Sequence, residues 1–202
     1  MNDIFYTIAK PIKDILYREK GSKFLGYAFP VNTVEEVKDC LDKIKKEHTT
    51  ARHYCYAYKI GFENNIQYRA NDDGEPNGTA GIPIYNQILS HELTNILIVS
   101  VRYFGGTKLG VSGLIKAYKT NAKDTLQAAS VIEKQIKNQL VVKFNYPQLS
   151  KVLNFIKKNE GTILNQKMEL SCEIRFMIRK TKTKSLLQKF ALMKNVTTLV
   201  ID

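Results

Sequence analysis

Apolar and polar positions alternate along the first part of the chain in the rhythm of β-strands and then in that of a helix. Residues 5–31 predict strands separated by turn-forming residues, with Lys23–Phe29 the clearest. Apolar residues then return every three or four positions, which predicts a helix that ends near residues 46–48. Thr33 and Glu36 have the spacing of a capping box at the start of this helix.

The middle of the chain predicts a mixed arrangement of strands and helices around two glycine-bearing loops. The most apolar run lies within residues 95–103 and predicts a central strand. The loop at residues 71–78 consists of turn formers, and we expect Thr79 to cap the helix that follows it. The predicted elements are strands at 53–61, 66–69 and 95–103 and helices at 79–90 and 111–129.

The last third predicts the succession β-α-β-β-α-β, which is the ferredoxin-like, or split β-α-β, order. Its last helix is expected to be capped by Thr181 or Thr183. The fold class is therefore α+β, with two domains at residues 1–132 and 133–202. The predicted elements are strands at 134–145, 162–167, 169–178 and 196–201, a helix that starts at Pro147 and a helix that ends near Leu192.

Length and composition narrow the class of protein. The 202 residues, 44% of them hydrophobic, suffice for two small cores. Because no run of 18 apolar residues occurs and the first residues lack the pattern of a secretory signal, we expect a cytoplasmic protein without a membrane span. The three cysteines are odd in number and lack CxxC spacing, which argues against a disulfide framework or a zinc site.

The charge of the chain is strongly basic and unevenly distributed. The formal net charge is +12, and the 65 residues from Asn138 to the end hold 12 Lys and Arg against 4 Asp and Glu. A field of this sign attracts polyanions and speeds their encounter. A solvated, lysine-rich surface would give the same count, so the charge by itself leaves both readings open.

The first glycine-bearing loop, residues 69–81, brings acids and a helix start together. Asp72, Asp73 and Glu75 are oxygen ligands of the kind that hold Mg²⁺. Arg69 and the amides of a helix that begins at Thr79 are candidate contacts for phosphate. The alternative is a polar loop whose acids form local turns and whose Thr79 is only a cap.

The second loop, residues 102–114, follows the central strand and opens a helix. Glycines such as Gly105 and Gly106 expose backbone amides, Arg102 forks phosphate, and Lys108 supplies a point charge. Tyr103 or Phe104 is a candidate for stacking on a base. The spacing differs from GxGxxG, so a dinucleotide site is not predicted. The alternative is that the glycines allow tight packing and the aromatic residues belong to the core.

Three further features are candidates for nucleic-acid contact. His53 begins a strand and is a possible phosphate contact or base, although a lone histidine more often has a structural role. Alternate residues of that strand, residues 54–58, are tyrosines that form one face. Lys180 and Lys182 lie at the start of the last helix, where they either touch phosphate or are solvated.

These motifs resemble the YigZ/IMPACT family. The resemblance is carried by residues 21–24 (GSKF), 51–57 (ARHYCYA), 71–81 (NDDGEPNGTAG) and 101–110 (VRYFGGTKLG). The two longer blocks make it specific. Asn77 stands where the family usually has serine, and Ser112 where it usually has glycine.

The resemblance implies an N-terminal domain similar to the second domain of ribosomal protein S5. It also implies a C-terminal ferredoxin-like domain similar to the last domain of elongation factor G. Eukaryotic relatives add another N-terminal domain and regulate translation through a stress kinase pathway. Because this chain begins directly with the shared domain, we do not carry the binding partner of those relatives over to it. Some bacterial members carry a peptidase label, for which this sequence offers no metal-ligand set or catalytic triad.

Three hypotheses follow for the function. The first is an RNA- or ribosome-binding regulator of translation that contacts phosphates from both domains. The second is a Mg²⁺-dependent enzyme that acts on a phosphorylated or nucleotide substrate, with the acids of the first loop facing Arg102 and Lys108 of the second. The third is a module that binds protein partners only. The first is favoured by the basic C-terminal part, by the glycine, arginine and lysine residues of the second loop, and by the resemblance.

Overall fold

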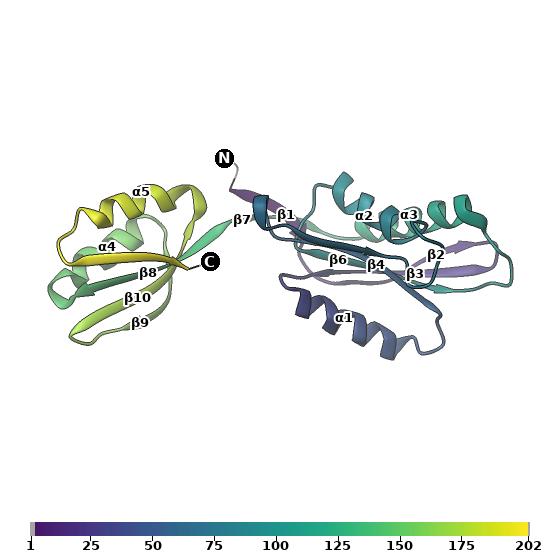
Figure 1. Cartoon of the computed structure of the whole chain (residues 1–202), viewed down its shortest axis with the longest axis horizontal. Coiled ribbons are helices and arrows are strands. Elements are labelled where there is room, and N and C mark those ends of the chain that lie inside the picture. The colour runs from purple at the N-terminus through teal and green to yellow at the C-terminus, as the bar shows by residue number, and fades with distance from the viewer. Residues whose placement is uncertain (1–2, 202) are drawn as a thin grey trace. The chain divides into compact units, whose positions relative to one another are not determined.

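The chain folds into two compact units in a computed structural model that describes residues 3–201, apart from the side chain of Asn64. One unit comprises Tyr6–Glu133, and we call it the N-terminal unit. The segment that ends at Phe5, together with the segment from Lys134 onward, forms the C-terminal unit. Both units combine helices with antiparallel strand pairs, as an α+β fold requires (Figure 1).

A five-stranded sheet organises the N-terminal unit, with strand order β2-β3-β6-β4-β5. Helices α2 and α3 cover one face, and α1 covers the other (Figure 1). Strands β1 and β7 pair with each other and form a separate two-stranded sheet. The bounds are β1 Ile4–Ile8, β2 Ile12–Glu19, β3 Ser22–Pro30, α1 Val34–Glu47, β4 His53–Ile60, a 3-10 turn Glu63–Asn65, β5 Gln67–Asn71, α2 Gly81–Ser90, β6 Ile96–Tyr103, α3 Gly110–Gln127 and β7 Val131–Gln135.

The central strand β6 is apolar almost throughout because both faces of the sheet are covered. Ile96 and Ile98 pack in the core under α2 and α3, whereas Leu97, Val99 and Val101 pack under α1. Successive side chains of a strand point to opposite faces. Arg102 therefore falls on the same face as Ile96 and Ile98, and only 5% of its surface is exposed.

The C-terminal unit follows the order β8-α4-β9-β10-α5-β11, with strand order β11-β8-β10-β9. Both helices of this unit pack on one face of its four-stranded sheet, and in the described part of the unit no helix packs on the other face (Figure 1). The bounds are β8 Lys137–Asn145, a 3-10 turn Tyr146–Gln148, α4 Leu149–Lys158, β9 Thr162–Lys167, β10 Ser171–Arg179, α5 Lys180–Ala191 and β11 Val196–Ile201.

The predicted cap of the first helix is correct, and those of two other helices are wrong. The Thr33 side chain accepts a hydrogen bond from the Glu36 amide, and Glu36 accepts one from Asn32. Thr79 does not cap α2, because its hydroxyl donates to the Pro76 carbonyl. Neither Thr181 nor Thr183 caps α5. The Thr181 hydroxyl donates to Asp3, and the Thr183 hydroxyl donates to the Arg179 carbonyl.

The single strand predicted at residues 134–145 is divided in the structure. Residues of β7 pair with β1, whereas β8 begins at Lys137 and pairs with β10 and β11. None of the helices in the described part of the chain is long and apolar enough to cross a membrane.

Candidate functional site

The two glycine-bearing loops meet through a buried ion pair. The Arg102 Nη1 donates to the Glu75 Oε1 at 2.6 Å, and the side chains are 6% and 4% exposed. Phe24 and Phe104 lie 5.5 and 5.6 Å from the Arg102 guanidinium carbon, measured to the ring centroids. Tyr118 also donates to the Glu75 Oε1, at 2.8 Å. Arg102 is therefore buried and paired with an internal carboxylate, while its contact with phosphate stays a prediction.

The remaining acids of the first loop also serve the fold. Asp72 Oδ1 accepts from the amides of Ala80 and Gly81 at 2.8 and 2.9 Å, so it caps α2 from outside the helix. Asp73 Oδ2 accepts from the Tyr54 amide at 2.7 Å. Within residues 3–201, no group of three or more His, Cys, Asp or Glu side chains is arranged to hold a metal. The geometry therefore favours structural roles for Asp72, Asp73 and Glu75 over the predicted Mg²⁺ site.

His53 and Thr79 belong to the same internal network. The His53 Nδ1 donates to the Asp73 carbonyl at 2.9 Å, which fixes the loop against β4. Thr79 is 1% exposed, so it is not placed to contact a large polyanion. Arg69 differs from both, because it is exposed on β5 at the edge of the sheet.

Burial sets the chemistry of the groups beside this network. Burial is the main cause of the raised pKa of the Cys55 thiol. This thiol donates to the Asp72 carbonyl at 3.0 Å. Burial also raises the pKa of the Tyr118 hydroxyl, next to Cys55 and Glu75. Both groups are therefore held in their neutral forms, and neither is an activated nucleophile.

The glycines of the second loop have different reasons to be glycine. A Cβ at Gly105 would lie 1.9 Å from the carbonyl carbon of Gly21, so the close approach to the β2–β3 turn requires its absence. Gly106 has a φ of +87° with open space around it, which favours glycine for its backbone conformation. The packing alternative is thus correct for Gly105, while Gly106 lies on an exposed turn beside the exposed Lys108.

Tyr103 lies on the opposite face of β6 from Arg102. Its hydroxyl is hydrogen-bonded to the Nδ1 of His48 at 2.9 Å, on the side of the sheet that α1 covers. The two side chains do not belong to one surface, and the prediction that Tyr103 stacks on a base beside Arg102 is not supported.

A pocket of about 340 Å³ opens where the second loop leads into α3. Arg102 and Lys108 supply cationic groups, and Glu75 supplies a carboxylate. Helix α3 begins in the pocket at Gly110 and has no side-chain cap. The lining residues are Glu75, Pro76, Arg102, Phe104, Lys108, Leu109, Gly110, Val111 and Leu114.

The two lysines predicted at the start of the last helix lie in different surroundings within the C-terminal unit. Lys182 Nζ lies 2.6 Å from Glu160 Oε2 and holds the pKa of that carboxyl below its usual range. Lys180, the first residue of α5, lines a pocket of about 630 Å³ with Asp3, Thr181 and other residues. Asp3 receives hydrogen bonds from the Arg179 guanidinium at 3.0 and 2.9 Å.

The helix-free face of the C-terminal sheet is a basic surface that the sequence analysis did not identify. Strand pairing places its residues in rows, because the side chains of paired residues share a face. One row holds Lys167, Glu173, Lys143 and Thr197; the next holds Asn165, Arg175, Val141 and Leu199; a third holds Thr162, Met177, Gln139 and Ile201; the last holds Arg179 and Lys137. Five cationic side chains therefore share the face with one carboxylate.

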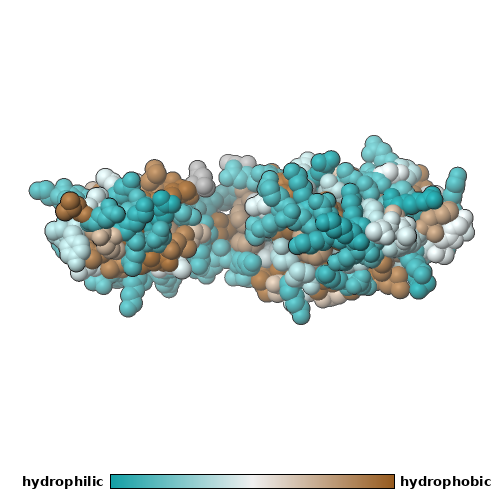
Figure 2. Space-filling model, turned by 90° about the horizontal axis from the view of Figure 1, so that it is seen from below, coloured by the Kyte–Doolittle hydropathy of each residue, from teal (hydrophilic) through white to brown (hydrophobic). Residues whose placement is uncertain are grey.

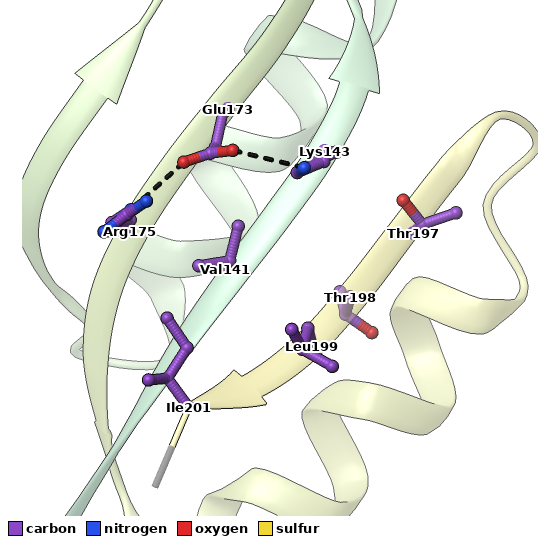
Figure 3. A pocket seen from close by; sticks show the side chains of 8 residues that line it. All are labelled: Val141, Lys143, Glu173, Arg175, Thr197, Thr198, Leu199 and Ile201. Atoms are coloured by element: carbon purple, nitrogen blue, oxygen red, sulfur yellow. Dashed lines mark hydrogen bonds and ion pairs between the residues drawn. The ribbon is translucent and has the colours of Figure 1, made fainter.

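A shallow groove of about 330 Å³ crosses this face around Val141 and Leu199 (Figure 3). Glu173 lies between two cations, 3.5 Å from Lys143 Nζ and 3.0 Å from Arg175 Nε, and the hydrogen bond from Arg175 is the main cause that lowers its pKa. Seen from the side opposite α4 and α5, hydrophilic and hydrophobic residues are intermingled on this unit (Figure 2). The signal in the sequence was the alternation of Lys137, Gln139, Val141 and Lys143 along one strand.

The comparisons with known proteins agree on one family. The model of the Impact N-terminal domain matches residues 20–126. The chain is 36% identical to the IMPACT family member YvyE of Bacillus subtilis over 77% of its own length and 71% of the relative's. It is 30% identical to YigZ of Escherichia coli over 85% of each chain.

A solved structure described as that of a hypothetical protein is also similar. It is 26% identical, has a TM-score of 0.75, and the match covers 100% of this chain and 99% of that one. The resemblance inferred from the motifs is thereby confirmed, and this chain belongs to the IMPACT family.

Proposed function

We propose that the protein binds RNA, on the ribosome or free, and regulates translation, and that the helix-free face of the C-terminal sheet is its binding surface. The observation that carries the proposal is the composition of that face, with five cations, one carboxylate and an apolar centre at Val141, Leu199 and Ile201. Asp3 offsets the charge of Arg179, and Glu173 offsets one of the charges of its two neighbours, Lys143 and Arg175, so five cations and two carboxylates leave a net excess of three positive charges.

The physical argument rests on charge and access. Lysine and arginine side chains displace the counterions that are condensed on the phosphates of RNA, and the release of these counterions gives a favourable and salt-dependent binding energy. The sheet face has no helix over it, and a backbone of phosphates can lie along its rows. Apolar side chains between the cations can contact sugars or bases. The family's eukaryotic relatives are named Protein IMPACT, and the role in translation rests on the resemblance set out above.

The proposed domain assignment is consistent with this role. We assign the N-terminal unit, Tyr6–Glu133, to a domain similar to the second domain of ribosomal protein S5, and the part of the C-terminal unit from Lys134 onward to a ferredoxin-like domain. The order β11-β8-β10-β9 with two helices on one face supports the second assignment. The enzyme hypothesis loses its main support, because the acids of the first loop are used in capping and pairing.

The test is salt-dependent binding of a single-stranded RNA by the full chain and two charge-matched double variants. Lys143→Gln with Lys167→Gln removes two cations from the proposed face. The control, Lys151→Gln with Lys158→Gln, removes two exposed lysines from α4 on the other side of the sheet. We expect the face variant to reduce the slope of log K against log salt by about 1.4, and the control to change it by much less.

Equal losses in both double variants would show that only the net charge matters and would contradict a binding face. Failure of the wild-type chain to bind RNA or to pellet with ribosomes at low salt would refute the proposed function itself.

A further inference from the structure

The pocket at the start of α3 combines several groups that favour an anion. The first amides of this 18-residue helix have no side-chain cap, so their N–H groups are free to bind a ligand. Lys108 is exposed at the rim and supplies the excess positive charge of the pocket, because Arg102 and Glu75 in the same lining neutralise each other. Glu75 already accepts from Arg102 and Tyr118, which satisfies the oxygen that faces them.

An unsatisfied donor in the same pocket is the second and independent observation. Arg102 is 5% exposed, and its Nε is the one buried side-chain nitrogen or oxygen in residues 3–201 that lacks a hydrogen-bond partner. The other two guanidinium nitrogens donate to Glu75 and to the Ser22 hydroxyl. Buried polar groups in folded proteins are nearly always paired, so this donor needs an acceptor, and a ligand of the pocket that Arg102 lines is a source of one.

The rest of the lining indicates what the anion is attached to. Phe104 and Val111 are 51% and 59% exposed, and Pro76 and Leu114 add further apolar surface. A pocket of about 340 Å³ exceeds what one phosphate group fills and lies at the lower end of the range for small organic ligands. The exposed ring of Phe104 is suited to stack on a planar group.

We propose that this pocket binds a phosphomonoester that carries an aromatic group, with the phosphate at the α3 amides and Lys108 and the planar group against Phe104. The site belongs to the N-terminal unit and is separate from the proposed RNA-binding face, so it adds a small-ligand activity to the proposed function. A terminal nucleotide of RNA and a free nucleotide share this chemistry.

The probes are AMP, adenosine and inorganic phosphate, added to the full chain and followed by calorimetry and by the NMR shifts of the Gly110 and Val111 amides. We expect AMP to bind and to move these amides, and adenosine not to bind. Inorganic phosphate should bind at least tenfold more weakly than AMP. An RNA with a 5′-phosphate that competes with AMP, where its dephosphorylated form does not, would identify the terminal nucleotide as the source; AMP binding without such competition would identify the free nucleotide.

Two variants and a control test the geometry. Lys108→Gln should weaken AMP binding about tenfold. Val111→Asp places a carboxylate in the first turn, where it favours the helix but repels the phosphate, so it should abolish binding while the chain stays folded. Lys123→Gln removes an exposed lysine of the same helix about 20 Å from Gly110 and should leave binding unchanged.

Several results would overturn the proposal: no AMP binding at millimolar concentration, equal binding of adenosine, or an equal loss in Lys123→Gln. Equal affinity for inorganic phosphate and AMP would overturn the assigned role of the apolar wall. The variant with Lys143→Gln and Lys167→Gln separates the two proposals, because it should lose RNA affinity but keep AMP affinity.

Discussion

At the scale of single residues, the pair of Arg102 and Glu75 is the most consequential contact of the N-terminal unit. Both side chains are almost fully buried, so removal of one charge leaves the other without compensation in a medium of low dielectric. We predict that Glu75→Gln lowers the free energy of unfolding by about 3 kcal/mol. Urea unfolding followed by circular dichroism measures this change.

The surface pair of Lys13 and Glu47 provides the control for that prediction. Its nitrogen and oxygen are 3.8 Å apart, and the side chains are 54% and 51% exposed. Glu47→Gln should cost less than about 1 kcal/mol, because solvent screens such pairs. Similar costs for the two substitutions would mean that the buried pair contributes no more than the exposed one.

Two neighbouring glycines allow a second test at this scale. Alanine at position 105 would bring a Cβ within 1.9 Å of the Gly21 backbone, and neither backbone can move without displacing β3 or β6. Alanine at Gly106 meets no atom and only adopts an unfavourable φ, at a cost of about 1 kcal/mol. Thermal unfolding should therefore show a markedly lower Tm for Gly105→Ala than for Gly106→Ala, and the reverse order would contradict the packing role.

At the scale of elements, periodicity in the sequence predicted the helices and most of the strands. The same periodicity predicts the burial of Arg102, because the alternation that puts Ile96 and Ile98 on one face of β6 puts Arg102 there too. The chemistry of the arginine side chain alone predicted an exposed position. The place of a residue in the alternation of a strand is thus a better guide to its burial than its residue type.

Other features of the elements depend on contacts that local sequence does not encode. The cap of α2 comes from Asp72, eight residues before Ala80, and not from the adjacent Thr79. The division of the strand predicted at 134–145 depends on pairing with β1, more than a hundred residues away. The basic face of the C-terminal sheet needs the register of four strands before its rows can be recognised.

At the scale of the whole molecule, the charges that sum to +12 are arranged differently in the two units, and these arrangements have different consequences. In the N-terminal unit, Arg102 is neutralised internally. In the C-terminal unit, lysines and arginines gather on a sheet face that no helix covers. The net charge itself predicts attraction to polyanions in general, but only these arrangements indicate where an RNA or a small phosphate would bind.

The described segment Asp3–Phe5 belongs to the C-terminal unit, where Asp3 is paired with Arg179, and this contact gives the chain a defined response to acid. The Arg179 guanidinium, followed by the Thr181 hydroxyl, holds the pKa of Asp3 well below its usual range. A carboxyl whose pKa is lower in the folded state stabilises the fold above its unfolded pKa, near 3.9, and this contribution is lost as the pH falls below that value. Asp3→Asn should therefore be less stable than the wild type at pH 7, and the difference should shrink below about pH 4. Calorimetric unfolding of both proteins between pH 2 and 7 measures it, and a difference that stays constant or grows in acid would show that the charge of Asp3 is not what holds this segment in place.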